Sequence, residues 1–174
     1  MTTLNRIFIL FLCTALLALN ACGFKLRSYA NSLPPELKTL YLNVDNPYGS
    51  FESLLKQALH SSGVTLVALP AQAPFILNTS KPVLITQNTT IGNTNEARVY
   101  NVNYSVKYSI TDRNSKTVLP PQEARATRSL TLNANQLLES NNQLTMLTRE
   151  MQREVITKIF NFLNSQEVAE MNWQ

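Results

Sequence analysis

The chain has 174 residues and a formal net charge of +4 at neutral pH, and only 15% of its residues are charged. This length fits one domain with a single hydrophobic core. One histidine and four glycines argue against a histidine metal site and a phosphate-binding glycine loop. We therefore expect a protein that is not an enzyme and that needs no metal or cofactor.

The first 21 residues have the pattern of a bacterial lipoprotein signal peptide. Arg6 is followed by the apolar run Ile7–Leu19, which is too short to span a bilayer core of about 30 Å. The run ends in Leu19-Asn20-Ala21-Cys22, which resembles the lipobox of bacterial lipoproteins. We expect cleavage between Ala21 and Cys22 and conversion of Cys22 to an N-palmitoyl, S-diacylglycerol cysteine. An ordinary secretory signal and a retained N-terminal membrane anchor are the alternatives.

Cleavage after Ala21 would leave a mature chain of 174 − 21 = 153 residues with a net charge of +3, because Arg6 is lost. Cys13 would leave with the signal and lipid would block Cys22. The mature chain would then have no free thiol, which suits an oxidising periplasm. That compartment, more than the small charge surplus, excludes nucleic acid as a partner. Asparagine is abundant, which indicates either a neutral polar surface that packs on another polar surface or AT-rich codon usage.

The mature chain begins with a predicted tether and continues into one α+β domain. Residues 22–36 form the tether, residues 37–165 the domain, and residues 166–174 a C-terminal tail. Within the domain, Leu37–Val44 has strand composition and precedes a turn at Asp45–Gly49. A helix is predicted from Ser50, as its N-cap, to Gly63 at its C-terminal end. The apolar positions of this helix recur at helical spacing and are Phe51, Leu54, Leu55, Ala58 and Leu59.

From residue 64 the sequence is rich in strand signals. Val64–Val67 predicts a short strand, and Phe75–Leu77 and Val83–Ile85 predict one bent strand with Pro82 at an edge or a bulge. Gly92–Asn95 predicts a hairpin turn. In the next strand apolar and polar residues alternate, so that one face lies on a core and the other is polar. The core-facing residues of this strand are Tyr100, Val102, Tyr104, Val106, Tyr108 and Ile110.

After a turn at Asp112–Ser115, a last strand is predicted over about Ala124–Leu132 and a helix from Asn141 or Asn142. On the solvated side of that helix, Glu154 and Lys158 form an i,i+4 pair. Its apolar stripe consists of Leu144, Leu147, Met151, Val155, Ile159 and Phe162. The predicted order is β-α-β-β-β-α. Two helices packed on one face of a mainly antiparallel four-stranded sheet would bury both apolar stripes.

Residues 98–128 carry a local charge of +4, more than the surplus of the whole mature chain. Because they fall in the hairpin region, we expect their basic side chains to share one end or face of the sheet and to bind an anionic lipid or a sugar phosphate. Scattered solvated charges are the alternative. The candidate binding residues are Arg98, Lys107, Arg113, Lys116, Arg125 and Arg128. In the last helix, Arg149, Arg153 and Lys158 neighbour two glutamates and are interpreted as part of a solvated face.

The segment Cys22-Gly23-Phe24-Lys25-Leu26-Arg27 resembles the mature N-terminus of the LPS-assembly lipoprotein family, LptE. That family opens with Cys-Gly, an aromatic residue, any residue, Leu and Arg. Ser28 stands where the family usually has Gly or Asp. The order of elements also agrees, and the last helix carries Met146-Leu147-Thr148-Arg149-Glu150-Met151, which is of the family's type. The resemblance covers nearly all of residues 22–163.

The resemblance implies an outer-membrane lipoprotein, anchored by its lipid, that faces the periplasm and a barrel lumen. Such proteins sit inside the β-barrel translocon LptD as a plug and assembly partner, and they bind lipopolysaccharide on its way to the outer leaflet. The family's proposed contacts are basic residues in the first hairpin, near Arg98 here, and in the loop before the last helix, where Glu139–Asn142 has no basic residue. Gly23 resembles an outer-membrane sorting signal.

Other functions remain open from the residues themselves. A lipoprotein of this size also fits an accessory subunit of a periplasmic lipid-transport ABC system or a pilotin-like chaperone of a secretion barrel. A purely structural envelope lipoprotein is a third class. The partner that co-purifies with the chain distinguishes these classes. A large β-barrel would support the LPS-assembly interpretation, and an inner-membrane ATPase complex would support the transport system.

Overall fold

The computed structural model describes residues 33–89, 97–133, 137–169 and 173. The predicted signal peptide, Cys22 and the predicted turn at Gly92–Asn95 lie outside the described residues. The helices and strands are β1 (Thr39–Val44), α2 (Ser50–Ser61), β2 (Thr65–Leu66), β3 (Phe75–Thr79), β4 (Val83–Asn88), β5 (Ala97–Asp112), β6 (Thr117–Asn133), α3 (Leu137–Leu163) and α4 (Gln166–Ala169). Within this described part, no helix is long and apolar enough to cross a membrane.

The strands form one six-stranded sheet of mixed direction. β1 pairs in parallel with β2 and β3, whereas β3, β4 and β6 each pair antiparallel with β5. The α+β class is therefore as predicted, but the mainly antiparallel four-stranded sheet is wrong in strand number and in the direction of β1. The parallel pairing of β1 with β2 follows from α2, which returns the chain to the end of the sheet where β1 began.

The single bent strand predicted around Pro82 is two strands in the structure, β3 and β4, with a break between them. β3 pairs with residues 108–112 of β5 and β4 with residues 100–105, so both follow the same edge of β5. Ser80 bridges the break, because its N–H donates to the carbonyl of Lys107 and its hydroxyl accepts from the N–H of Lys107. Proline has no N–H to give to a strand ladder, and pairing resumes only after Pro82.

β5 lies at the centre of the sheet and presents one face to the core. Its buried residues are Val102, Tyr104, Val106, Tyr108 and Ile110, as the alternation predicts. Tyr100, which was also predicted to face the core, is only half-buried. The polar residues between them lie on the open face of the sheet. There Asn103 Oδ1 accepts a 2.7 Å hydrogen bond from Thr127 Oγ1, and Asn101 Oδ1 accepts one of 3.0 Å from Ser129 Oγ.

β6 begins at Thr117, well before the predicted start at Ala124. The part that was not predicted contains Pro120-Pro121, but β6 pairs only with β5 and an edge strand tolerates prolines. The register also shifts near these prolines. As a result the core-facing positions change from the even series of Ala124 to the odd series of Leu119, which is fully buried. The break in alternation hid this part of the strand.

α2 packs on the core through Phe51, Leu55 and Leu59, as its spacing predicts. Its N-cap is Gly49, so the predicted cap at Ser50 is wrong by one residue. The Ser50 hydroxyl instead accepts a 2.9 Å hydrogen bond from Gln152 Nε2 of α3. At the other end, Gly63 has a φ of +78°, the left-handed conformation expected of a glycine that terminates a helix.

α3 begins at Leu137, so the predicted start at Asn141 or Asn142 is wrong. Good helix formers precede the asparagines, and the helix continues through them instead of starting there. Its buried apolar residues are Met151, Val155, Ile156, Ile159, Phe160 and Leu163. The predicted stripe included three of these and missed the others, because the C-terminal half of α3 is packed over more than one helix face. Leu144, Leu147 and Phe162 are half-buried.

Two residues of the predicted C-terminal tail, Val168 and Trp173, pack against the domain. α4 follows α3, and Val168 within it is fully buried. The ring of Trp173 contacts Phe75 edge-on, with ring centroids 5.1 Å apart. Contacts with the domain therefore occur beyond residue 165, at these two positions.

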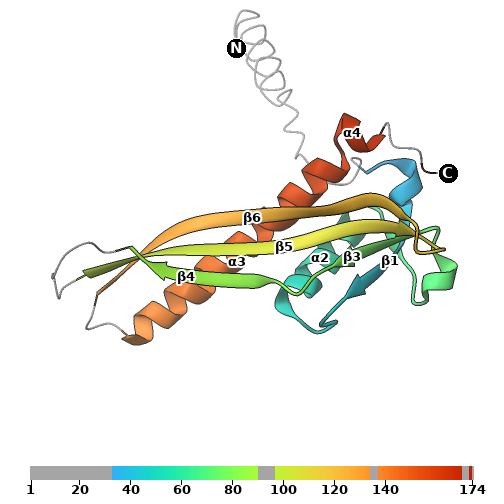
Figure 1. Cartoon of the computed structure of the whole chain (residues 1–174). Helices are drawn as coiled ribbons and strands as arrows, with labels where there is room; N and C mark the ends of the chain where they lie inside the picture. Colours follow the sequence, from blue (N-terminus) through green and yellow to red (C-terminus); the bar gives the residue numbers. More distant parts are fainter. Residues whose placement is uncertain (1–32, 90–96, 134–136, 170–172, 174) are drawn as a thin grey trace, which may run out of the picture.

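Figure 1 shows both main helices behind the sheet, on the same face. Ring contacts fix them there: Phe51 of α2 lies 6.1 Å from Tyr104, and Phe162 of α3 lies 6.1 Å from Tyr108. α3 runs along the long β5–β6 hairpin, whereas α2 covers only the end that carries β1 and β3. The other end of the hairpin faces α3 without a second helix beside it.

Candidate functional site

The six basic residues predicted to bind an anion do not share one surface. Arg98 and Arg113 mark opposite ends of β5, roughly 50 Å apart for an extended strand of this length. Lys107 and Arg125 lie on the open face of the sheet, whereas Arg128 follows the buried even positions of β6 and lies on the helix side. The prediction of one shared patch is therefore wrong.

Arg128 is engaged by α3. Its guanidinium forms an ion pair with one carboxylate oxygen of Glu154, and the other oxygen lies 2.9 Å from Lys158 Nζ, which confirms the predicted i,i+4 pair. Lys158 also donates a 2.6 Å hydrogen bond to the carbonyl of Arg125. The hydrogen bond from Lys158, assisted by Arg128, lowers the pKa of the Glu154 carboxyl. The cluster ties α3 to the edge strand β6.

Glu123 compensates the two basic residues of the open face. Its Oε1 lies 3.0 Å from Arg125 Nη2, and Lys107 is its register partner on β5. The hydrogen bond from Arg125 lowers the pKa of Glu123, and a hydrogen bond with Ser105 and the charge of Lys107 add to this. These charges balance one another locally, so this part of the sheet is a weak attractor for an anion.

The remaining candidates lie at the two ends of β5. Arg98 is exposed and stands in the even, helix-side series of β5, at the end away from α2. At the other end, Arg113 Nε donates to the carbonyl of Ala73 at 3.3 Å. Lys116 is exposed in the turn there, where Asp112 Oδ1 accepts its backbone N–H.

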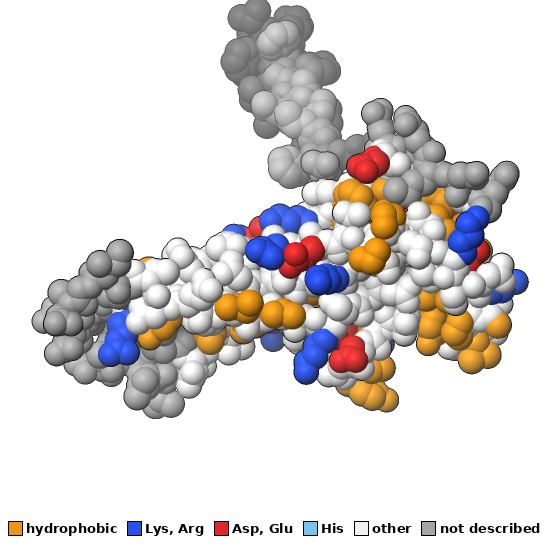
Figure 2. All heavy atoms as spheres, viewed as in Figure 1, with side chains coloured by type: hydrophobic (Ala, Val, Ile, Leu, Met, Phe, Trp, Pro, Cys, Tyr) orange, Lys and Arg blue, Asp and Glu red, His pale blue; other side chains and the backbone are white. Residues whose placement is uncertain are grey.

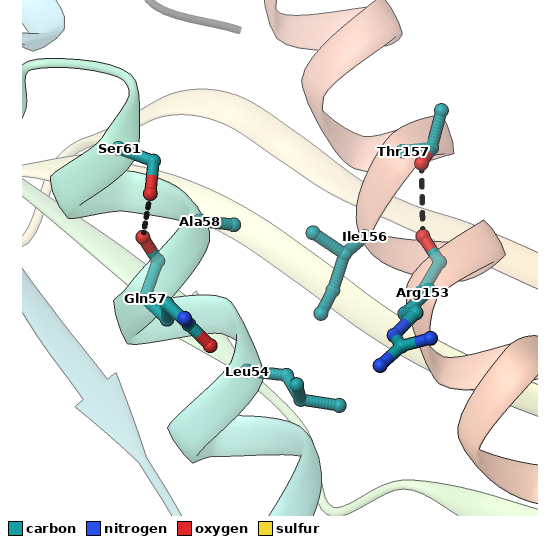
Figure 3. A pocket seen from close by; sticks show the side chains of 7 residues that line it. All are labelled: Leu54, Gln57, Ala58, Ser61, Arg153, Ile156 and Thr157. Atoms are coloured by element: carbon teal, nitrogen blue, oxygen red, sulfur yellow. Dashed lines mark hydrogen bonds between the residues drawn. The ribbon is translucent and has the colours of Figure 1, made fainter. Parts of the chain in front are cut away.

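A first hollow lies between α2 and α3, with a volume of about 270 Å³. Leu54 and Ile156 face each other across it, and the Arg153 guanidinium extends from α3 into the space between the helices (Figure 3). Gln57 adds an amide on the α2 side. The hydroxyl of Thr157, on the α3 rim, already donates to the carbonyl of Arg153 at 2.9 Å. The hollow therefore combines an apolar floor with one cation at its rim.

A second hollow, of about 320 Å³, lies beyond the N-terminus of α2, where β4 faces α3. Its apolar walls are Leu84, which is 43% exposed, and the half-buried Leu144. Arg149 lines it on α3, one helical turn before Arg153. Among the described residues, neither arginine has an ion-pair or hydrogen-bond partner for its guanidinium.

Sequence reasoning assigned Arg149 and Arg153 to a solvated helix face and so missed the hollows. Within α3, Glu154 faces β6 and is neutralised there, while the arginines follow a different stripe that borders α2 and β4. The signal in the sequence was the i,i+4 spacing of the two arginines, which places them on one side of the helix. Which partner that side faces could not be read from the sequence.

Much of the open face of the sheet is neither charged nor hydrophobic, and charged side chains gather over its middle part (Figure 2). Asparagine, serine and threonine side chains of β5 and β6 cover it, several of them hydrogen-bonded to each other. Along β4, Val83 and Ile85 are 48% and 49% exposed on the same face. In the described part of the chain, no group of three metal-ligating side chains lies together.

A six-stranded mixed sheet with two helices on one face and a mainly polar surface on the other defines a two-layer α+β domain. The chain belongs to the lipopolysaccharide-assembly family LptE, whose family model matches residues 37–163. The match covers almost all of the folded domain, from the start of β1 to the end of α3.

A curated relative supports the same family. The LPS-assembly lipoprotein LptE of Yersinia enterocolitica is 41% identical over 66 residues, which are 38% of this chain and 31% of that protein. The aligned segment thus spans about a third of the relative's length.

Solved structures share the fold. An NMR structure of an uncharacterized lipoprotein B from Nitrosomonas europaea matches with a TM-score of 0.68 and 20% identity, covering 84% of this chain and 94% of that one. A minor lipoprotein from Acinetobacter baumannii gives 0.63 and 20%, with 78% and 94% covered. The rare lipoprotein B from Shewanella oneidensis gives 0.60 and 16%, with 75% and 97% covered.

Proposed function

We propose that this protein is an outer-membrane lipoprotein that assists the assembly of lipopolysaccharide into the outer leaflet, as a partner and plug of the β-barrel LptD, and that it binds lipopolysaccharide. The family match over residues 37–163 carries the proposal. The role is one of binding and assembly and requires no catalysis. The name of the Yersinia relative, an LPS-assembly lipoprotein, supports the same role.

The anchor of the proposed lipoprotein is Cys22. The short apolar run before it and the lipobox-like Leu19–Cys22 support cleavage after Ala21 and acylation of the cysteine. Two or more acyl chains give stable membrane attachment. Intact-mass spectrometry of the membrane-extracted protein should show the loss of residues 1–21 and a lipid adduct. A mature N-terminus at another residue would remove the basis for the anchor.

The open face of the sheet is the proposed contact with the polar wall of the barrel lumen. Asn103, Thr127 and their neighbours can exchange water for polar partners without the large desolvation cost of a buried charge. Cross-linking supplies a test at single-residue precision. A photo-reactive amino acid at Asn103 should yield a covalent adduct with the barrel, whereas one at Ser61, on the helix side, should not. Equal adducts from both positions would contradict this orientation.

The partner itself is tested by affinity purification of the tagged, acylated protein from detergent-extracted outer membranes. The proposal predicts one large β-barrel in stoichiometric amount. Co-purification of an inner-membrane ATPase complex in its place, or recovery of the protein only in the inner membrane, would refute the proposal and favour a lipid-transport accessory subunit.

Lipopolysaccharide binding was predicted for the basic residues of the hairpin region, with Arg98 first. Arg98 is exposed at the free end of β5, and Lys107, Arg113, Lys116, Arg125 and Arg128 have the separate surroundings described above. Arg98→Glu should weaken binding of lipopolysaccharide by the mature chain carrying Cys22→Ser, with a stronger effect at low salt. Binding that ignores this change and the salt concentration would exclude Arg98 as a contact.

A further inference from the structure

We propose that the two hollows along α3 form a binding site for a phosphate-bearing lipid. In this site Arg149 and Arg153 hold the phosphate, and the apolar walls of the hollows take the hydrocarbon chains. The inference deepens the proposed function and rests on it for the source of the lipid. The site itself stands on the geometry of α2, β4 and α3.

The two guanidiniums supply the anion-binding half of the site. They are one helical turn apart, which places their Cβ atoms about 5–6 Å from each other, so one phosphate group can contact both side chains. A guanidinium can give paired N–H donors to phosphate oxygens. Both are free of ion pairs among the described residues, unlike Arg125 and Arg128, whose charges are held by Glu123 and Glu154.

The acidic neighbours of the two arginines lie outside the hollows, although Glu150 is exposed on α3 only three residues before Arg153. No aspartate or glutamate lines either hollow. The acidic residue at the start of α2, Glu52, is buried with its carboxylate at Gly49. The stripe of α3 that carries Arg149 and Arg153 is therefore positive, while the stripe that carries Glu154 is compensated by Arg128 and Lys158.

The apolar walls supply the second half of the site. Leu54 and Ile156 line one hollow, and Leu84 and Leu144 line the other. Leu84 stands 43% exposed although its register partner Tyr104 is buried, because α2 ends before it can cover β4. Concave apolar surface next to an unpaired cation matches an amphiphile with an anionic head better than it matches free phosphate or a neutral lipid.

The probe for this site is dodecyl phosphate below its micelle concentration, added to the mature chain of residues 22–174 with Cys22→Ser. Dodecyl maltoside has the same chain with a neutral head, and inorganic phosphate has the charge without a chain. Calorimetric titration should show saturable binding of dodecyl phosphate. Dodecyl maltoside and inorganic phosphate should bind at least about tenfold more weakly. In NMR spectra, the amide chemical-shift changes caused by dodecyl phosphate should concentrate at Leu84, Arg149 and Arg153. Equal binding of dodecyl maltoside, or no saturable binding of dodecyl phosphate, would overturn the inference.

Variants locate the site. Arg149→Gln with Arg153→Gln should weaken binding of dodecyl phosphate about tenfold or more, while the lysine pair at the same positions retains part of it. The matched control, Lys38→Gln with Lys81→Gln, removes two exposed charges that line neither hollow and should bind like the parent chain. Only variants whose thermal midpoints equal that of the parent chain are compared, so that a loss of binding is not a loss of folding. A glutamine pair that binds as the parent does would refute the site.

Lipopolysaccharide, titrated in parallel, separates this inference from the proposed function. If the glutamine pair binds lipopolysaccharide as the parent chain does, the hollows are not the lipopolysaccharide site, and the family role stays intact. Binding of dodecyl phosphate that depends on both arginines, without binding of lipopolysaccharide, would support the site and refute lipopolysaccharide as its ligand.

Discussion

Replacing Tyr104 should expose how the helix layer is held to the sheet. Its ring is only 3% exposed and contacts Phe51 of α2, and its hydroxyl is hydrogen-bonded to Gln152 of α3, which in turn donates to Ser50. Tyr104→Ala removes the ring from a closely packed interface. By analogy with Phe→Ala in protein cores, we expect a loss of roughly 3–5 kcal/mol in the free energy of unfolding.

Two further variants separate the terms of this prediction. Tyr104→Phe keeps the ring and removes the hydroxyl that is hydrogen-bonded to the buried Gln152 side chain, which should cost about 1 kcal/mol. Asn103→Ala, one residue away on the open face, loses a solvent-exposed hydrogen bond with Thr127 and should cost less than about 1 kcal/mol. Urea unfolding of the Cys22→Ser mature chain measures all three. Equal, small losses for Tyr104→Ala and Asn103→Ala would show that the assignment of the two sheet faces is wrong.

The same ring predicts the response to alkali. Burial raises the pKa of Tyr104 and of Tyr108 to about 12 from the ordinary value of 10.0. A group whose folded pKa is raised gives its full stabilisation below the unfolded pKa and loses it as the pH rises through the folded value. We therefore expect stability to fall between pH 10 and 12, by on the order of 2 kcal/mol per ring. A double Phe variant at these positions should remove most of that slope, and a slope that stays would place the cause elsewhere.

Three other changes test the fold locally. Gly63→Ala meets no atom within 4 Å but must hold a φ of +78°, so unfolding experiments should show a loss of about 1 kcal/mol from backbone strain alone; no loss would mean that the helix end has relaxed. Glu154→Gln should cost under about 1 kcal/mol at pH 7. Because the Glu154 pKa is lowered in the fold, this cost should disappear as the pH falls through that value, and a cost that persists in acid would assign it to packing. Trp173→Ala should lower the thermal midpoint by several degrees through its contact with Phe75, whereas an unchanged midpoint would make residue 173 dispensable.

Local patterns predicted most of the elements because their causes are local. The alternation in β5 and the spacing in α2 each reflect one face on one core, and Gly63 reports the end of its helix directly. The early part of β6 was not predicted as a strand, for a reason that no local pattern contains. Pro120-Pro121 is compatible with a strand only at an edge, and the register shift there reverses which residues face inward.

The candidate site was harder to predict than the fold because the sequence does not show which residues a charged side chain contacts. Six basic residues close together in sequence are spread along the hairpin, since a strand moves roughly 3.3 Å per residue. Two of them, Arg125 and Arg128, are paired with glutamates, one near in sequence and one on α3. In the sequence Arg149 and Arg153 are balanced by their glutamate neighbours, yet Glu154 faces β6 and no glutamate lines the two hollows.

The two proposed surfaces lie on opposite sides of the sheet, and this makes them compatible. Docking of the open face against a polar wall would use Asn103 and its neighbours on β5 and β6, and it would leave the helix side uncovered. A lipid held by Arg149 and Arg153 would remain accessible from that side while the protein is seated. The asymmetry has a simple physical origin, because both helices lie on one face and the other face must be soluble without them. A polar face with few charged side chains serves that purpose and can also be desolvated at lower cost than a highly charged one.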